Sequence, residues 1–133
     1  MNMKPNAILT VTSLLTVALF SIHVTDDIIR GMSQGGAREN VILVLIMVVY
    51  LCGTLIVGER RLGQVIMLLG GLASAAMPLL HGRSTSHSGS VAQASGGFLF
   101  IWTVLTMGAT GAFSAILAVL RMIAGNESPD RRG

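Results

Sequence analysis

Residues 21 to 31, SIHVTDDIIRG, place a histidine, two adjacent aspartates and an arginine within eight positions. Imidazole and carboxylate side chains are ligands for zinc and copper, and residues three or four apart on a helix can point at one ion. His23 and Asp27 have this spacing, as do Asp26 and Arg30. The stretch therefore indicates a site that binds a metal ion, handles protons or holds a small polar ligand.

A purely structural explanation of the same residues stays open. The stretch ends the first long apolar block, and polar side chains gather where the hydrocarbon of a membrane stops. In this explanation the aspartates only accept hydrogen bonds from Arg30, Arg38 or the following loop. The spacing also differs from specific zinc signatures such as HExxH or paired CxxC motifs.

The elements that must position these residues are apolar helices. Of the 133 residues, 52% are hydrophobic and 11% are charged, less than half the roughly 25% charged fraction of soluble domains. Apolar residues form four blocks, approximately 7–24, 41–57, 62–80 and 97–120, each near the ~20 residues that cross about 30 Å of hydrocarbon. We predict an all-α, polytopic integral membrane four-helix bundle of one domain, with a flexible outer loop at 81–96 and a disordered tail at 124–133.

The distribution of basic residues predicts the orientation of this bundle. Four spans place the N-terminus, the second loop and the C-terminus on one side. That side carries six of the nine basic residues: Lys4, Arg60, Arg61, Arg121, Arg131 and Arg132. By the positive-inside rule we predict that both termini are cytoplasmic, in a bacterial inner membrane or a plasma membrane. We expect the first block to remain as an uncleaved span, because a cut near Ala18 would fall inside the apolar run.

This topology brings the three histidines of the chain to one side. His23 ends the first block, His81 ends the third, and His87 lies in the following loop. We predict His23, Asp26, Asp27 and His81 as candidate ligands of a zinc or copper ion, and no other cofactor. The alternatives are a proton-handling pair of His23 and Asp27, and a small ligand held by polar groups at the mouth of the bundle.

The third and fourth blocks carry small residues four positions apart. The pairs are Gly70 with Ser74, Gly71 with Ala75, Gly108 with Ala112, and Gly111 with Ala115. Small residues at this spacing form a shallow groove in which another helix can approach closely. We therefore predict that these two helices are close neighbours. We also expect the grooves to support association with a second copy or with another membrane protein.

Several functional classes are disfavoured. No apolar block carries Asp, Glu, Lys or Arg in its middle, whereas proton-driven transporters usually hold a charge there. The HExxH, P-loop and CxxCH motifs are absent from the sequence, so we predict neither an enzyme nor a nucleic-acid partner. The expected function is a non-enzymatic interaction or accessory subunit in the lipid bilayer. The alternative is an outer-face ligand site that serves transport or sensing.

Overall fold

The computed structural model describes residues 5–29, 36–83 and 97–125. Within these ranges the chain forms four helices and no strand, namely α1 (Pro5–Ile29), α2 (Gly36–Leu55), α3 (Arg61–Arg83) and α5 (Gly97–Ala124). All four are long and apolar enough to span a membrane. The all-α class and the four apolar helices are confirmed, whereas the side on which the termini lie stays a prediction.

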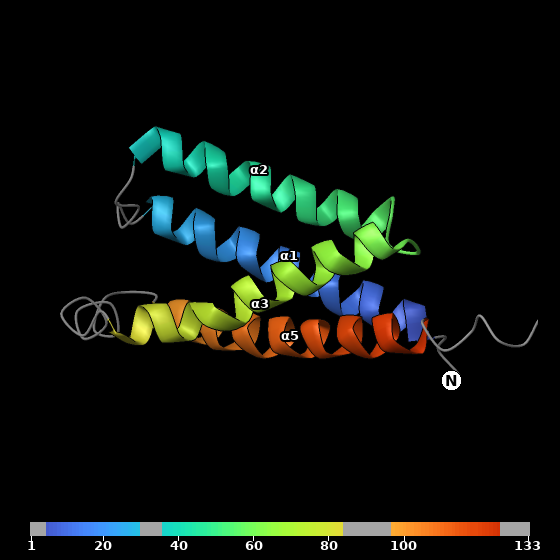
Figure 1. Ribbon diagram of the computed structural model, residues 1–133. Coiled ribbons are helices and arrows are strands. Elements are labelled where there is room, and N and C mark those ends of the chain that lie inside the picture. Colours follow the sequence, from blue (N-terminus) through green and yellow to red (C-terminus); the bar gives the residue numbers. More distant parts are fainter. Residues whose placement is uncertain (1–4, 30–35, 84–96, 126–133) are drawn as a thin grey trace, which may run out of the picture.

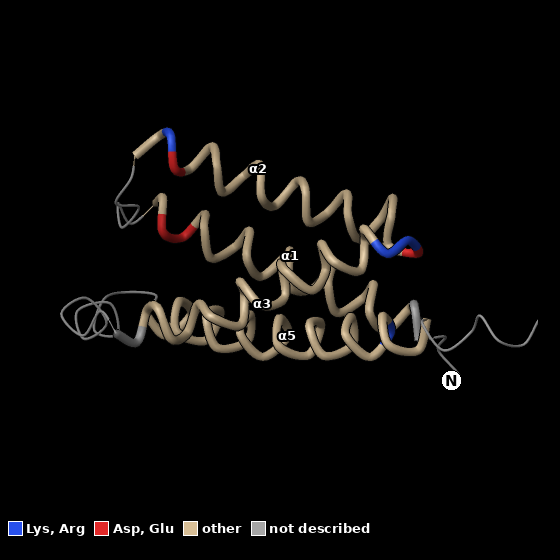
Figure 2. Tube along the Cα trace, viewed as in Figure 1, with Lys and Arg blue, Asp and Glu red and all other residues tan. Residues whose placement is uncertain are grey.

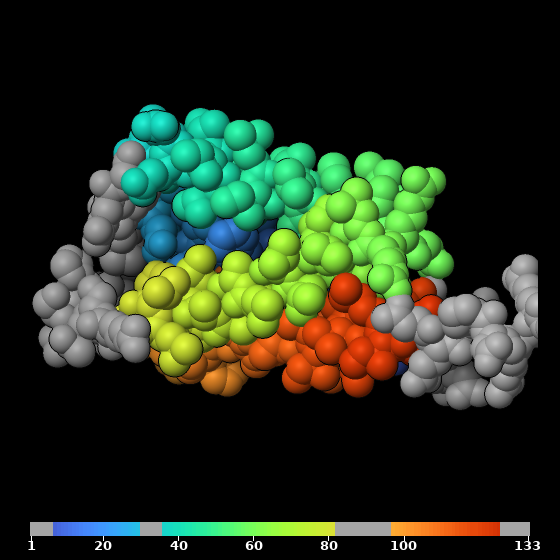
Figure 3. Space-filling model, viewed as in Figure 1, coloured from blue at the N-terminus to red at the C-terminus, as the bar shows by residue number. Residues whose placement is uncertain are grey.

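Consecutive helices run in opposite directions, so the described chain begins and finishes at the same end of the bundle (Figure 1). We call the opposite end, where α1 and α3 finish and α2 and α5 begin, the histidine end. In the space-filling view α1 shows only between α2 and α3, which cover much of it on this face (Figure 3). The first helix contacts each of the other three described helices.

The helices overrun the predicted apolar blocks at the histidine end. α1 continues beyond residue 24 to Ile29, and α3 continues to Arg83, so residues 81–83 are helical rather than the start of the predicted loop. Hydropathy marks where hydrocarbon ends, not where backbone hydrogen bonding ends, which explains the difference. Residues 84–96 of the predicted loop and 126–133 of the predicted tail lie outside the described residues. α2 ends at Leu55, slightly before the predicted limit at 57.

Charged residues lie near the helix ends (Figure 2). The charged residues whose side chains are described are all found there. They are Asp26, Asp27, Arg38, Glu39, Glu59, Arg60, Arg61 and Arg121. Between them, the long middle of the described bundle carries none. A charge near the centre of a bilayer is costly, so this distribution fits a bundle that spans a membrane.

The tightest helix pair is α3 with α5. A Cβ atom built on Gly71 would lie 2.7 Å from the carbonyl oxygen of Gly111, and a Cβ on Gly111 would lie 2.7 Å from that of Gly71. Only glycine allows two backbones to approach this closely. The two helices are thus the close neighbours that the sequence predicts.

The core follows the inner faces of α1 and α5. Near the middle of the bundle, Ser13 Oγ lies 2.7 Å from Ser114 Oγ, and both side chains are fully buried. The Tyr50 hydroxyl of α2 lies 3.5 Å from the same Ser114 oxygen. Toward the histidine end, Phe20, Val24 and Met107 form an apolar cluster. This cluster separates the buried hydroxyl groups from the residues that end α1.

Candidate metal centre

The candidate site begins on α1, whose inward face repeats every three or four residues. Ser13, Thr16, Phe20 and His23 are all buried on this face, which packs against the rest of the bundle. Asp27 lies one turn beyond His23. Because α1 remains helical to Ile29, the spacing of these two residues places both side chains on the same side of the helix.

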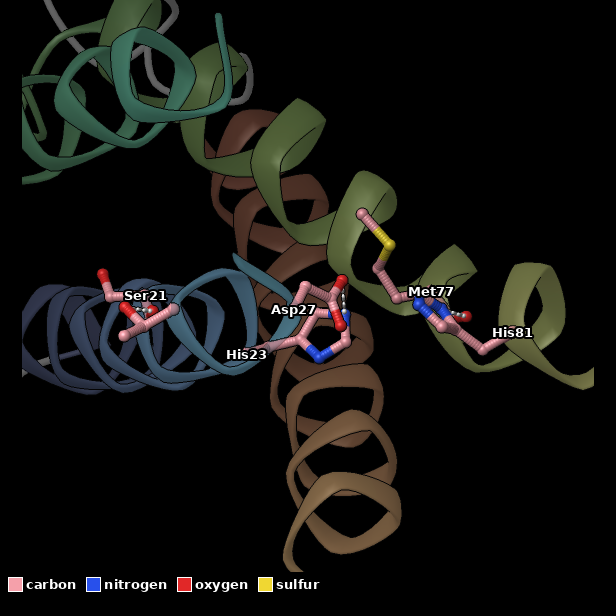
Figure 4. Close-up of polar contacts among 6 residues, drawn as sticks. Ser21, His23, Asp27, Met77 and His81 are labelled. Carbon is pink, nitrogen blue, oxygen red and sulfur yellow. Dashed lines mark hydrogen bonds and ion pairs between the residues drawn. The ribbon is translucent and has the colours of Figure 1, made fainter. Parts of the chain in front are cut away.

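The third residue of the site comes from the far end of α3. The ring of His81 lies edge to face with the ring of His23, with centroids 4.9 Å apart. His23 Nε2 lies 3.6 Å from Asp27 Oδ2. One ligand atom each from His23, Asp27 and His81 lies within 4.8 Å of the other two. We call these three residues the ligand cluster. In Figure 4 the ring of His81 faces His23 and Asp27 across the gap between α3 and α1.

The fourth predicted ligand is not part of this cluster. Asp26 instead lines a cavity of about 330 Å³ between α1 and α5, which it shares with His23 and Phe100. Adjacent helical residues differ in direction by about 100°, so the two neighbouring aspartates face different surroundings. The remaining histidine of the sequence, His87, lies outside the described residues.

The hydrogen bond of His81 fixes which of its ring nitrogens is available. Its Nδ1 lies 3.0 Å from the backbone carbonyl oxygen of Met77. A carbonyl oxygen only accepts, so Nδ1–H is the donor, and the neutral ring keeps its lone pair on Nε2. Histidines that bind metals usually donate their second nitrogen to a carbonyl or carboxylate in this way.

His23 is held differently. Its side chain is 2% exposed, and its Nδ1 is buried without a hydrogen-bond partner among the described residues. The 3.6 Å separation from Asp27 is longer than a hydrogen bond between nitrogen and oxygen. Packing therefore places this imidazole, and neither ring nitrogen is committed to a short hydrogen bond with a described residue.

Phe100 of α5 forms the apolar wall of the ligand cluster. Its ring centroid lies 5.2 Å from that of His23 and 5.6 Å from that of His81. Asp27 is 24% exposed and His81 is half-buried. Within the cluster, His23 is thus buried, whereas Asp27 and His81 are partly accessible.

Two imidazoles and one carboxylate form the ligand set of many zinc sites that keep a fourth position open. Zinc bonds of about 2.0 to 2.1 Å in a tetrahedron place neighbouring ligand atoms about 3.4 Å apart. The separation of 3.6 Å between His23 and Asp27 is close to this value. The helical spacing on α1 alone thus places two candidate ligand atoms about as far apart as tetrahedral zinc requires.

No protein-family model, no curated protein and no solved structure matches the chain. Any function for the ligand cluster must therefore be argued from its own residues.

The predicted helix-packing residues lie in three different places. Gly71, Ser74, Ala75, Gly111 and Ala115 meet at the contact between α3 and α5. Gly70 faces the ring of Tyr50 on α2, and Gly108 lies against the ring of Pro78. Ala112 is half-buried on α5. Because the closest contacts of these small residues are made within the chain, Gly71 and Gly111 are not available to a second copy.

One residue of the site was not singled out from the sequence. Phe100 belongs to a buried face of α5 that also includes Val104, Met107 and Gly111. The spacing of three and four residues along this face is visible in the sequence and marks Phe100 as inward-facing. The sequence gives no sign, however, that the ring lies beside both histidines.

Proposed function

We propose that this chain is a small multi-pass membrane protein that binds a zinc ion at the histidine end of its helix bundle. The ligands are His23, Asp27 and His81. The observation that carries the proposal is the convergence of two imidazoles and a carboxylate, from two different helices, within 4.8 Å. Polar residues that simply end a membrane span have no need to meet across helices.

The type of ligand favours zinc over copper in its reduced state. Imidazole and carboxylate groups suit zinc, whereas thiolate and thioether sulfur atoms select Cu(I). Met77 is next to the ligand cluster, but the contact with His81 is made by its backbone carbonyl. Zinc is therefore the first ion to test, and Cu(II) is the natural competitor because it also accepts imidazole.

The number of ligands favours a site from which the ion can leave. Structural zinc sites are usually closed by four protein ligands, whereas the ligand cluster supplies three and leaves a position for water or an exchanging ligand. Reversible binding suits transport or sensing of the ion. With both termini cytoplasmic, as the basic residues predict, the site opens on the outer face of the membrane.

Grooves of small residues are the reason to expect an accessory subunit. Two residues of these grooves, Gly71 and Gly111, already contact each other where α3 packs against α5. A protein partner would thus have to use another surface. For this reason we place zinc binding before the role of an interaction subunit.

The proposal is tested by zinc titration of the purified full chain in lipid nanodiscs, with isothermal calorimetry and elemental analysis. We expect the native chain to bind close to one zinc ion. His23→Ala, Asp27→Asn and His81→Ala should each weaken binding by more than about tenfold, because an open site has few ligands to lose.

Asp26→Asn is the matched control, since it removes the adjacent carboxylate, which lies outside the ligand cluster. It should bind zinc as the native chain does. Circular dichroism shows whether each variant keeps its helices. The absence of zinc binding by the native chain, or full binding by both histidine variants, would contradict the proposal.

A further inference from the structure

The distances between ligand atoms of the cluster do not all match those of a tetrahedral zinc site. His23 and Asp27 are separated by 3.6 Å, near the spacing of about 3.4 Å that tetrahedral zinc requires. The cluster as a whole extends to 4.8 Å. Ligand atoms this far apart must come closer when one ion is bound by all three residues. Because His81 is the member that α3 supplies, this shortening brings the end of α3 toward α1.

His81 also lies in a turn of α3 whose neighbouring side chains are largely exposed. Beyond Pro78, the side chains of Leu79 and Leu80 are 71% and 59% exposed, so little packing holds this part of α3 in place. His23, by contrast, is buried against Phe100. The helices α1 and α3 make the least contact with each other of the helix pairs that touch.

Pro78 supplies a pivot at the required place. Proline has no backbone N–H, so the carbonyl group of Ser74 lacks its usual donor within the helix, and the helix is weakened at this point. The proline ring itself lies against Gly108 of α5, where a Cβ atom would overlap it. The pivot is thus held against α5 while the turn beyond it is less restrained.

We propose that zinc binding draws the last turn of α3 toward α1 about Pro78. This inference rests on the proposed zinc site and adds its regulation. The ion acts as a clamp between two helices that otherwise contact each other little. The position of the end of α3 therefore depends on whether zinc is bound. A sensor or a gated transporter needs a coupling of this kind between binding and conformation.

Zinc K-edge X-ray absorption on the native full chain, loaded with one equivalent of zinc, tests the closure directly. Closure requires two imidazole nitrogens on the same ion at about 2.0 to 2.1 Å. Bound zinc with only one imidazole would overturn the clamp and leave metal binding itself intact. Absence of bound zinc would overturn the proposed function as well, so the two failures are distinguishable.

Pro78→Ala tests the pivot, because alanine restores the missing N–H without adding bulk against Gly108. We expect the dissociation constant for zinc to rise by at least about fivefold, a typical coupling between binding and conformation. Leu80→Ala is the control, since it trims an exposed side chain of the same turn, and it should leave the dissociation constant unchanged. An unchanged constant in Pro78→Ala, with helix content retained, would overturn the pivot. If that variant does not fold, the absorption spectrum of the native chain still decides whether the ligands converge.

Discussion

His23 and His81 come from α1 and α3, yet their rings lie edge to face with centroids 4.9 Å apart. Two positively charged imidazoles at this distance would repel strongly beside the apolar ring of Phe100. In the proposed site both rings are neutral, each offers a lone pair to the ion, and Asp27 balances part of the charge of the ion. The contact between the two histidines therefore leads to a prediction about pH.

Zinc binding should weaken as the solution becomes more acidic. Histidine binds a metal only in its neutral form, so protons and zinc compete for the same ring nitrogens. Histidine side chains change charge between about pH 5 and 8, so we expect the affinity to fall as the pH is lowered through this range. Calorimetry in buffers of different ionisation enthalpy should show proton release on zinc binding at the lower pH values. An affinity that is constant over this range would exclude histidine as the ligand.

The contact between Gly71 and Gly111 should be needed for folding rather than for association. The Cβ atom that Gly111→Ala adds would lie 2.7 Å from the carbonyl oxygen of Gly71. Overpacking of this kind costs about 1 to 3 kcal/mol. We expect a lower free energy of unfolding for Gly111→Ala, measured by denaturant titration in detergent.

Ala109→Val is the control for this substitution, because Ala109 is exposed on the same helix. It adds bulk toward the surroundings and should leave the free energy of unfolding nearly unchanged. A stable Gly111→Ala protein with altered oligomeric state would instead support a role of the groove in self-association.

The fold was predictable to the extent that it depends on local properties. Four apolar blocks of membrane-spanning length predict four helices, and small residues predict that α3 and α5 pack closely. The pairing of His23 with Asp27 is also local, since four residues correspond to about one helical turn. The proximity of His23 and Asp27 could therefore be predicted from the sequence.

The rest of the site depends on how helices cross and where they end. The topology predicts His81 on the same side as His23, but its contact with the ligand cluster also depends on α3 continuing as a helix past its apolar block, which hydropathy does not reveal. Asp26 and Asp27 are the same residue type at adjacent positions, so their different surroundings follow only from the rotation of α1 against its neighbours. The crossing of α1 and α3 is a tertiary property that no local pattern specifies.

The predicted orientation can be checked with single cysteines on a background in which the exposed Cys52 is replaced by serine. Ile29→Cys lies at the histidine end and Glu59→Cys at the opposite end, and both positions are exposed. With cytoplasmic termini, a membrane-impermeant maleimide should label Ile29→Cys on intact cells. Glu59→Cys should react only after the cells are permeabilised. The reverse pattern would place the ligand cluster on the cytoplasmic side, where it would meet the intracellular zinc pool.

Phe100 should position the two imidazoles without binding the ion itself. It is buried, and its ring lies 5.2 Å from His23 and 5.6 Å from His81. Phe100→Leu keeps the site apolar but removes the flat aromatic surface beside the two imidazoles. Groups that orient metal ligands contribute about tenfold or more to affinity, so we expect zinc binding to weaken by about tenfold with unchanged stoichiometry.

Phe98→Leu provides the comparison for Phe100→Leu, because Phe98 is exposed on the same helix and stacks on Trp102 rather than on a histidine. Its zinc affinity should equal that of the native chain. If both substitutions weaken binding equally, the effect comes from a general loosening of α5. If only Phe100→Leu does so, the affinity depends on how the two imidazoles are held. A site that depends on this aromatic wall draws on three helices for its geometry, although only α1 and α3 supply ligands.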